Sequence, residues 1–170
     1  ACSYLCVNPF EKYSVYTQPL AEKDNLRTHN TDKYALRKIS WQQTIDTNIL
    51  TIPIHSTLRT YTEVIARCKR NLFVVVGEND YFSGLLVMDD HRDIIFKQEL
   101  YDTVHVEDLM IEPEEFIYDD DTAAVVLEKF KRTGNFNMPV INRDRKYIGF
   151  VSKAKFLSEY QTFIADNSED

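Results

Sequence analysis

Residues 81–93 have the sequence YFSGLLVMDDHRD. This pattern predicts a short apolar strand that opens on Gly84 and continues into a helix through two carboxylates. Residues 147–155, YIGFVSKAK, echo it, and Gly84 and Gly149 are 65 positions apart (149 − 84 = 65). Because much of the surrounding sequence matches at the same offset, we expect two copies of one folding unit.

Each copy opens with a strand and a helix. β-Branched and aromatic residues at 49–54 and, more briefly, at 115–118 predict the strands. Ser56 and Asp121, again 65 apart, are suited to cap the helices that follow. Those helices present matching apolar stripes, formed by Leu58, Tyr61 and Ile65 in the first copy and by Ala123, Val126 and Phe130 in the second.

A hairpin and a second helix complete each copy. The turns between the second and third strands are polar and short enough for hairpins. The third strand is expected to start near each glycine. The remaining elements are strands at 72–76 and 137–141, turns at 77–80 and 142–146, and second helices at 89–96 and 153–163. The predicted fold is α/β (α+β), a β-α-β-β-α unit used twice, with the two units packed together to bury their sheets.

The composition is that of an acidic globular chain. Of 170 residues, 44% are hydrophobic and 28% are charged, and the net charge of −7 argues against a nucleic-acid partner. No apolar run approaches the ~18 residues that a membrane span needs, and no signal-peptide pattern is visible. Three scattered cysteines, Cys2, Cys6 and Cys68, give neither a disulfide framework nor a zinc site. We therefore expect a soluble chain in a reducing compartment.

The ends of the chain lie outside the repeat. Residues 1–20 are apolar and rich in tyrosine but lack an amphipathic period, which suggests a piece of something larger. Residues 21–44 are mostly polar and are interpreted as a linker. A short helix is expected at 33–41, anchored by Tyr34, Leu36 and Ile39. Residues 166–170 form an acidic tail.

The repeat resembles the CBS motif, and the two copies together resemble a CBS pair, in which two motifs pack about a pseudo-twofold axis. The resemblance is carried by FVVV at 73–76 with GLLVMDD at 84–90, by MPVI at 138–141 with GFVSKAK at 149–155, and by VEDLM at 106–110. The last stretch is similar to the one that usually opens a second motif. On this basis motif 1 covers 45–109 and motif 2 covers 110–165, and a homodimer through the CBS helices is expected.

A narrower resemblance extends over the whole chain. FEKYSVYTQPLA at 10–21, KRNLF at 69–73 and ELYDTV at 99–104 are similar to the C-terminal end of bacterial CLC-type chloride channels and transporters. In that family a tyrosine of the last membrane-domain helix helps to coordinate chloride, and Tyr13, or else Tyr16, matches it. The resemblance implies a regulatory module at the cytoplasmic face of the inner membrane, partnered by its own membrane domain. It leaves channel and proton-coupled exchanger as alternatives.

CBS pairs of this kind can hold AMP, ADP or ATP between their motifs. An aspartate binds the ribose and a hydroxyl residue meets phosphate, since a carboxylate accepts from hydroxyls and a helix N-terminus favours phosphate. In this chain each motif has only one of the two residues. Motif 1 has the aspartate, Asp90, but Val87 replaces the hydroxyl residue; motif 2 has the hydroxyl residue, Ser152, but Lys155 replaces the aspartate. The nucleotide-binding positions that the resemblance implies are Thr51, Phe73, Val87, Asp90, Ser152, Lys153 and Lys155.

No catalytic or metal constellation emerges from the sequence. The triplet at 91–93 begins like a kinase catalytic loop, but the asparagine that should follow is replaced by Gln98 and a glycine-rich loop is missing. The acidic run at 119–121 lacks the alternation and the glycine of a calcium loop. We therefore expect no enzyme and no metal. The alternatives are a dimerisation scaffold without ligand and a CBS pair that controls an enzyme or a metal-ion transporter.

Overall fold

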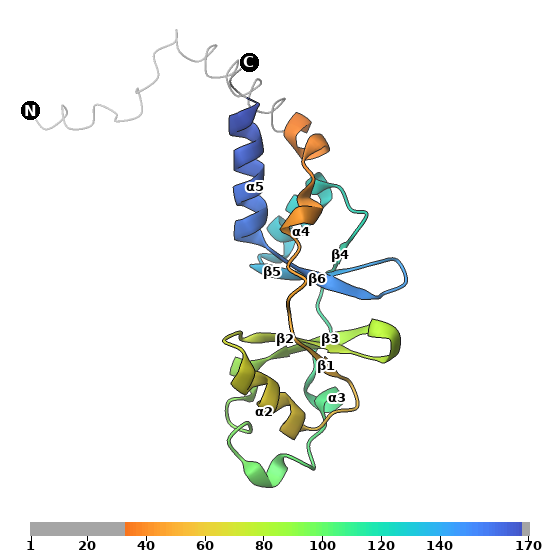
Figure 1. Ribbon diagram of the computed structural model, residues 1–170, viewed down its shortest axis with the longest axis vertical. Helices are drawn as coiled ribbons and strands as arrows, with labels where there is room; N and C mark the ends of the chain where they lie inside the picture. The colour runs from red at the N-terminus through yellow and green to blue at the C-terminus, as the bar shows by residue number, and fades with distance from the viewer. Residues whose placement is uncertain (1–32, 168–170) are drawn as a thin grey trace, which may run out of the picture.

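The computed structural model of the chain describes residues 33–167. The expectations for Tyr13, Tyr16 and the segment 1–20 lie outside these residues, as do the first half of the proposed linker, residues 21–32, and the last three residues of the acidic tail. The described part has two three-stranded sheets that face each other at the middle of the molecule (Figure 1). Helices α4 and α5 lie beyond one sheet, and α2 and α3 lie beyond the other.

The two sheets have the same topology. Strands β1 (Thr51–Pro53), β2 (Leu72–Val76) and β3 (Phe82–Val87) form the first, in that order. Strands β4 (Ile117–Tyr118), β5 (Asn137–Ile141) and β6 (Tyr147–Ser152) form the second. In each sheet the first two strands are parallel and the last two antiparallel. The predicted repeat and fold class are confirmed.

The remaining elements are helices and short 3-10 turns. Helices α2 (Leu58–Arg67) and α4 (Ala123–Thr133) occupy equivalent positions, and α5 (Lys153–Asp166) follows β6 directly. The others are α3 (Val106–Leu109) and the 3-10 segments η2 (Trp41–Thr44), η3 (Glu78–Asp80), η4 (Met88–His91) and η5 (Gln98–Leu100), with a further helical segment at 33–38. Gly134 ends α4 in the left-handed conformation (φ 70°), as glycine commonly does at a helix C-terminus.

The register of the two hairpins shows how closely the halves match. Val75 lies opposite Gly84 in the first sheet, and Val140 lies opposite Gly149 in the second. Both hairpins have an irregularity one residue later. Tyr81 and its own counterpart, Lys146, form an antiparallel bridge between the two sheets. A residue that pairs with its own equivalent must lie on the symmetry axis, so this bridge marks the pseudo-twofold axis between the halves.

Apolar residues are buried in three places. One cluster lies between the first sheet and its helices and includes Ile52, Tyr61 and Phe73, all at most 1% exposed. A second fills the equivalent space in the second half, around Ile117 and Phe130. A third lies between the two sheets and draws on both halves; its buried members are Val74, Val76, Phe82, Leu85, Ile141 and Phe150. The third cluster joins the halves into one core.

Each sheet is extended by the segment that precedes the other sheet. Asp46 pairs with Phe150 through two backbone hydrogen bonds of 2.7 and 2.9 Å, and Ile111 pairs with Leu85 in the same way at 2.8 Å. Both contacts run past a glycine. A Cβ on Gly149 would lie 2.6 Å from the Asp46 carbonyl oxygen, and one on Gly84 would lie 2.9 Å from that of Ile111. The segment around Asp46 is called the first tether below, and the segment around Ile111 is called the second tether.

The chain before the first tether also packs on the second half. Trp41 is 1% exposed, and its indole N–H donates to the Asp121 carbonyl at 2.7 Å. Ile39 is buried in the same cluster. The helical segment at 33–38 is shorter than predicted, and Tyr34, expected to be an anchor, is 54% exposed. The proposed linker therefore ends in residues that belong to the second core.

Several predicted boundaries are wrong in an informative way. Gly84 is the third residue of β3 rather than its start, because the strand begins at Phe82. The helix N-caps are Thr57 and Thr122, one residue after the predicted Ser56 and Asp121. The shift of one residue is the same in both halves, so the two observed N-caps are still 65 residues apart.

The second helix expected at 89–96 is absent from the first half. Its place is taken by the 3-10 segment η4 and by turns up to Phe96. The carbonyl of Ile95 accepts a hydrogen bond of 2.8 Å from the Tyr101 hydroxyl. Asp, His and β-branched residues have low helix propensity, so nothing local opposes this outcome. The counterpart helix α5 does form, over a longer range than the predicted 153–163.

Candidate functional site

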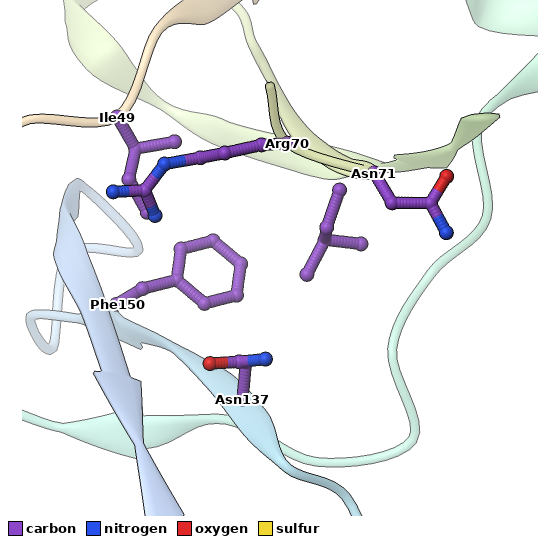
Figure 2. A pocket seen from close by; sticks show the side chains of 6 residues that line it. Ile49, Arg70, Asn71, Asn137 and Phe150 are labelled. Atoms are coloured by element: carbon purple, nitrogen blue, oxygen red, sulfur yellow. The ribbon is translucent and has the colours of Figure 1, made fainter. Parts of the chain in front are cut away.

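A pocket of about 190 Å³ opens between the two halves where β2 and β5 begin (Figure 2). Its walls come from both halves: Ile49, Arg70, Asn71, Leu72, Asn137 and Phe150. Leu72 and Asn137 are equivalent residues, so the pocket reaches the pseudo-twofold axis at the end remote from the Tyr81–Lys146 bridge. Arg70 and Asn71 lie just before β2, where the chain enters the sheet.

The charged group of this pocket is the guanidinium of Arg70. In Figure 2 its side chain reaches towards Ile49, above the ring of Phe150. It donates to a carboxylate oxygen (Oδ2) of Asp46 at 2.8 Å. The other Asp46 oxygen accepts from the amide N–H of Asn48 at 3.0 Å. The hydrogen bond from Arg70 holds the pKa of the Asp46 carboxyl below its usual range, and the positive charge of Lys155 acts in the same direction.

Tyr147 brings a polar atom into the core on this side of the molecule. Its hydroxyl is buried and has no hydrogen-bond partner among the described residues. Burial raises the pKa of this phenol, and the nearby negative charge of Asp46 adds to the effect. A buried hydroxyl without a partner destabilises a protein. A water or another polar group that reached this hydroxyl would satisfy it.

Phe82, Phe116 and Arg145 form another group between the sheets, at the counterparts of Tyr147, Thr51 and Asp80. Phe82, the counterpart of Tyr147, meets Phe116 edge-on with ring centroids 5.3 Å apart. Arg145 lies 5.2 Å over the Phe116 ring. The position equivalent to Phe116 in the first half is Thr51, which has a far smaller side chain. The group Phe82, Phe116 and Arg145 is called the aromatic cluster below; its Phe82 ring also lies 6.4 Å from the Tyr147 ring.

The predicted phosphate-binding residues lie at the start of α5. The Ser152 hydroxyl caps the helix by accepting from the Lys155 amide at 3.2 Å. In its first turn Lys153 is partly exposed and Lys155 is exposed. Lys155 is close enough to Asp46 to lower the pKa of its carboxyl. The structure therefore brings this helix end near the Arg70–Asp46 pair, although none of the three residues lines the pocket.

The other predicted residues are spread more widely. Thr51 is exposed on β1, opposite Val74. Val87 ends β3, and Asp90 is exposed in η4. Burial raises the pKa of the Tyr61 phenol, and the negative charge of Asp90 raises it further. Phe73 is 1% exposed and packs edge-on against Tyr61 at 5.5 Å, so its side chain offers no surface to a ligand. Of the seven predicted residues none lines the described pocket.

Arg70 and Asp46 were not predicted as site residues. The stretch 69–73 stood out only as part of a family resemblance, and Asp46 had no signal at all. The two are 24 residues apart, and Asp46 pairs through its backbone with β6 of the second half while Arg70 leads into β2 of the first, so no spacing rule could pair them. A polar residue immediately before a buried strand, such as Arg70 or Asn71, was the one local hint, because such positions lie at the rim of a sheet.

Residues 33–167 contain no group of three His, Cys, Asp or Glu side chains placed to hold a metal ion. No helix among them has the length and apolar character needed to cross a membrane.

Comparison with known proteins agrees with the architecture. Residues 106–161 match the CBS domain family. Solved structures that pair two such domains cover most of the chain. This chain has the fold of a CBS pair. No curated protein matches the sequence.

Three solved structures illustrate the likeness. The CBS pair/ACT domain protein from Thermotoga maritima is 18% identical, with a TM-score of 0.58 over 71% of this chain and 95% of that one. The CBS domain of a bacterial CNNM/CorC family Mg²⁺ transporter, in complex with ATP, is 15% identical, with a TM-score of 0.62 over 79% and 97%. CbpB, in complex with c-di-AMP, is 11% identical, with a TM-score of 0.66 over 84% and 97%. At these identities the likeness establishes the fold.

Proposed function

We propose that this CBS pair is a non-catalytic regulatory module that binds an adenine nucleotide in the pocket between its halves. The pocket itself carries the proposal, because it combines a positive guanidinium, amide side chains and apolar walls in one place. Apolar walls suit a base, and a guanidinium suits a phosphate. The structural neighbours in complex with ATP and with c-di-AMP support the ligand class.

The residues proposed to meet the ligand come from both halves. Arg70, Lys153 and Lys155 would face the phosphates, and Ser152 would contribute its hydroxyl beside the start of α5. Thr51 would contact the ligand from β1, on the face of the first sheet that is turned towards the second. Asp90, the counterpart of Lys155, lies near Val87 at the end of β3, on the other side of the axis. Its proposed ribose contact therefore applies to a ligand on that side.

Isothermal titration of the full chain with AMP, ADP and ATP at millimolar concentration tests this proposal. We expect saturable heat for at least one nucleotide. Arg70→Ala and Lys155→Ala should each weaken that binding about tenfold, since each removes a charge-assisted contact of about 1.5 kcal/mol. Asp90→Ala should leave it unchanged; a loss confined to Asp90→Ala would place the ligand on the other side. No heat with any nucleotide would refute the nucleotide proposal.

We further propose that the module serves a membrane protein, a CLC-type chloride channel or transporter, at the cytoplasmic face of the membrane. The sequence resemblance at 10–21, 69–73 and 99–104 supports this parent. Ligand binding would shift the packing of the two halves, by no more than the ligand's differential affinity for the two states. The test is chloride flux in liposomes for the protein encoded together with its upstream reading frame.

A metal-ion transporter is the second candidate parent. Structural neighbours include CBS domains of a CNNM/CorC family Mg²⁺ transporter and of a membrane protein from Sphaerobacter thermophilus. Magnesium flux without chloride flux in the same liposomes would favour it. A dimer in sedimentation that is indifferent to nucleotides would instead favour a scaffold role, because CBS pairs are expected to associate through their helices.

A further inference from the structure

The ion pair between Asp46 and Arg70 crosses from one half of the molecule to the other. Arg70 belongs to the first half, on the segment that leads into β2. Asp46 belongs to the first tether, and its backbone is fixed to β6 of the second half by its two hydrogen bonds with Phe150. The pair therefore joins a wall of the pocket to the opposite sheet.

The Asp46 carboxylate is hydrogen-bonded to the guanidinium of Arg70, the same group to which a ligand phosphate would bind. Arg70 is the only cation among the residues that line the described pocket. Its contact with Asp46 is a hydrogen bond through one terminal nitrogen, at 2.8 Å. A phosphate group can take two parallel hydrogen bonds from a guanidinium, and such paired contacts are stronger than single ones. A phosphate that reached Arg70 would therefore compete well with Asp46.

The ion pair is weak enough to be displaced. The side chains of Arg70 and Asp46 are 48% and 37% exposed. Ion pairs between exposed side chains contribute little, because water and salt screen them and because two long side chains must be held still. Asp46 would also keep a partner after losing Arg70, since its other oxygen accepts from Asn48.

We infer that Asp46 is a built-in competitor for the anionic group of the ligand at Arg70. This inference rests on the proposed function, because it takes a phosphate-bearing nucleotide as the ligand. Binding exchanges the carboxylate for a phosphate and so removes the side-chain link between the first tether and the first half. The tether keeps its backbone bonds to Phe150. The two halves then respond to the ligand through a contact that the other tether lacks, since Ile111 and Asn135 stand at its equivalent positions.

A charge-neutral substitution tests this competition. In the full chain, Asp46→Asn should lower the dissociation constant for ATP about three- to fivefold, the factor that corresponds to losing an exposed ion pair. Arg70→Gln should raise it about tenfold. In the Arg70→Gln background, Asp46→Asn should have no further effect, because the competition requires both partners. Isothermal titration at fixed ionic strength measures all four forms.

Asp102→Asn is the matched control. Asp102 forms an exposed pair of 2.7 Å with Arg59 that does not border the pocket, and its substitution changes the net charge by the same amount. It should leave ATP binding unchanged. If ATP binds the unsubstituted chain and Asp46→Asn binds it no more tightly than Asp102→Asn does, the competitor is refuted and the proposed function stands. If neither the unsubstituted chain nor Asp46→Asn binds ATP, ADP or AMP, both fall.

Discussion

The two halves of this molecule share a framework but differ in chemistry. Residues that face the helices are apolar in both, as in the pair Ile52 and Ile117, each 0% exposed. Between the sheets the halves diverge: Phe82 and Phe116 of the aromatic cluster have Tyr147 and Thr51 as their counterparts, and Arg70 of the pocket has Asn135. The shared positions account for the fold, and the divergent ones make the space between the sheets asymmetric.

A second difference lies inside the second half alone. Lys129 is buried there and donates to Asp121 at 2.6 Å and to the Phe116 carbonyl at 2.7 Å. The equivalent positions in the first half are Val64 and Ser56, which carry no charge. The buried pair also fixes the carbonyl of a residue in the aromatic cluster. The buried Lys129 thus helps to hold Phe116, one of the rings of the aromatic cluster, in position.

Breaking this buried pair should have the largest effect on stability. Asp121→Ala leaves the buried Lys129 ammonium with only the more distant Glu115 carboxylate, at 3.7 Å, and the Phe116 carbonyl, so it should cost up to about 3–5 kcal/mol of the free energy of unfolding. The double substitution Asp121→Ser with Lys129→Val, which copies the first half, should be far less harmful. Urea unfolding followed by circular dichroism measures both. A double variant as unstable as the single one would show that the first half is not a valid template.

The two tethers should differ in their tolerance of a methyl group. Gly149→Ala would push a Cβ to 2.6 Å from both the Asp46 carbonyl oxygen and the Ile45 side chain, so we expect a loss of about 2–3 kcal/mol. Gly84→Ala meets its nearest atom at 2.9 Å and should lose about 1–2 kcal/mol. Gly77→Ala, whose nearest contact is an ordinary 3.4 Å, is the control. Equal losses at the two tether glycines would contradict the comparison.

Exchanging the residues that differ across the axis should transfer their properties. Thr51→Phe places a ring on the first half where the second has Phe116, and we expect it to crowd the inter-sheet space and weaken ATP binding about tenfold, or about 1.4 kcal/mol. Thr51→Val keeps the volume and should bind as before. Titration calorimetry distinguishes them. If Thr51→Phe binds ATP normally, the size of residue 51 is not what separates the two sides.

Removing the unpartnered hydroxyl should have the smallest effect. Tyr147→Phe deletes a buried group without a hydrogen bond and restores the residue type of Phe82, so it should stabilise the chain by up to about 1 kcal/mol at neutral pH. Because burial raises the pKa of Tyr147 above its usual value of about 10, its native form resists ionisation.

The Tyr147 phenol therefore contributes a pH dependence of definite sign. The free energy of unfolding is unaffected by this group below pH ~10 and falls as the pH rises from there towards the folded pKa. It falls because the Tyr147 phenol loses its proton more readily in the unfolded chain than in the folded one. Tyr147→Phe should lessen the loss of stability in this alkaline range, measured by thermal unfolding. Tyr61 has a similarly raised pKa and stays as an internal reference. A Tyr147→Phe chain with the same alkaline slope as the unsubstituted one would contradict this assignment.

The apolar repeat predicted most of the fold, because it repeats in space as it does in sequence. Strands β2 and β5 begin and end where the β-branched runs do. The helix expected at 89–96 failed, since its apolar spacing was compatible with turns that the Tyr101 hydroxyl also stabilises. The site was harder to predict. Arg70 and Asp46 meet only because each tether crosses to the opposite sheet, and one chain carries no local signal of that crossing.

The crossed tethers also decide how the molecule would bear a mechanical load. The chain that arrives through Trp41 and Ile45 is anchored first in the second half and reaches β1 only afterwards. A pull on the chain before Trp41 would therefore load the two backbone hydrogen bonds between Asp46 and Phe150 before it loaded the first sheet. Such a force would reach the Asp46 carboxylate before it reached any strand of the first half.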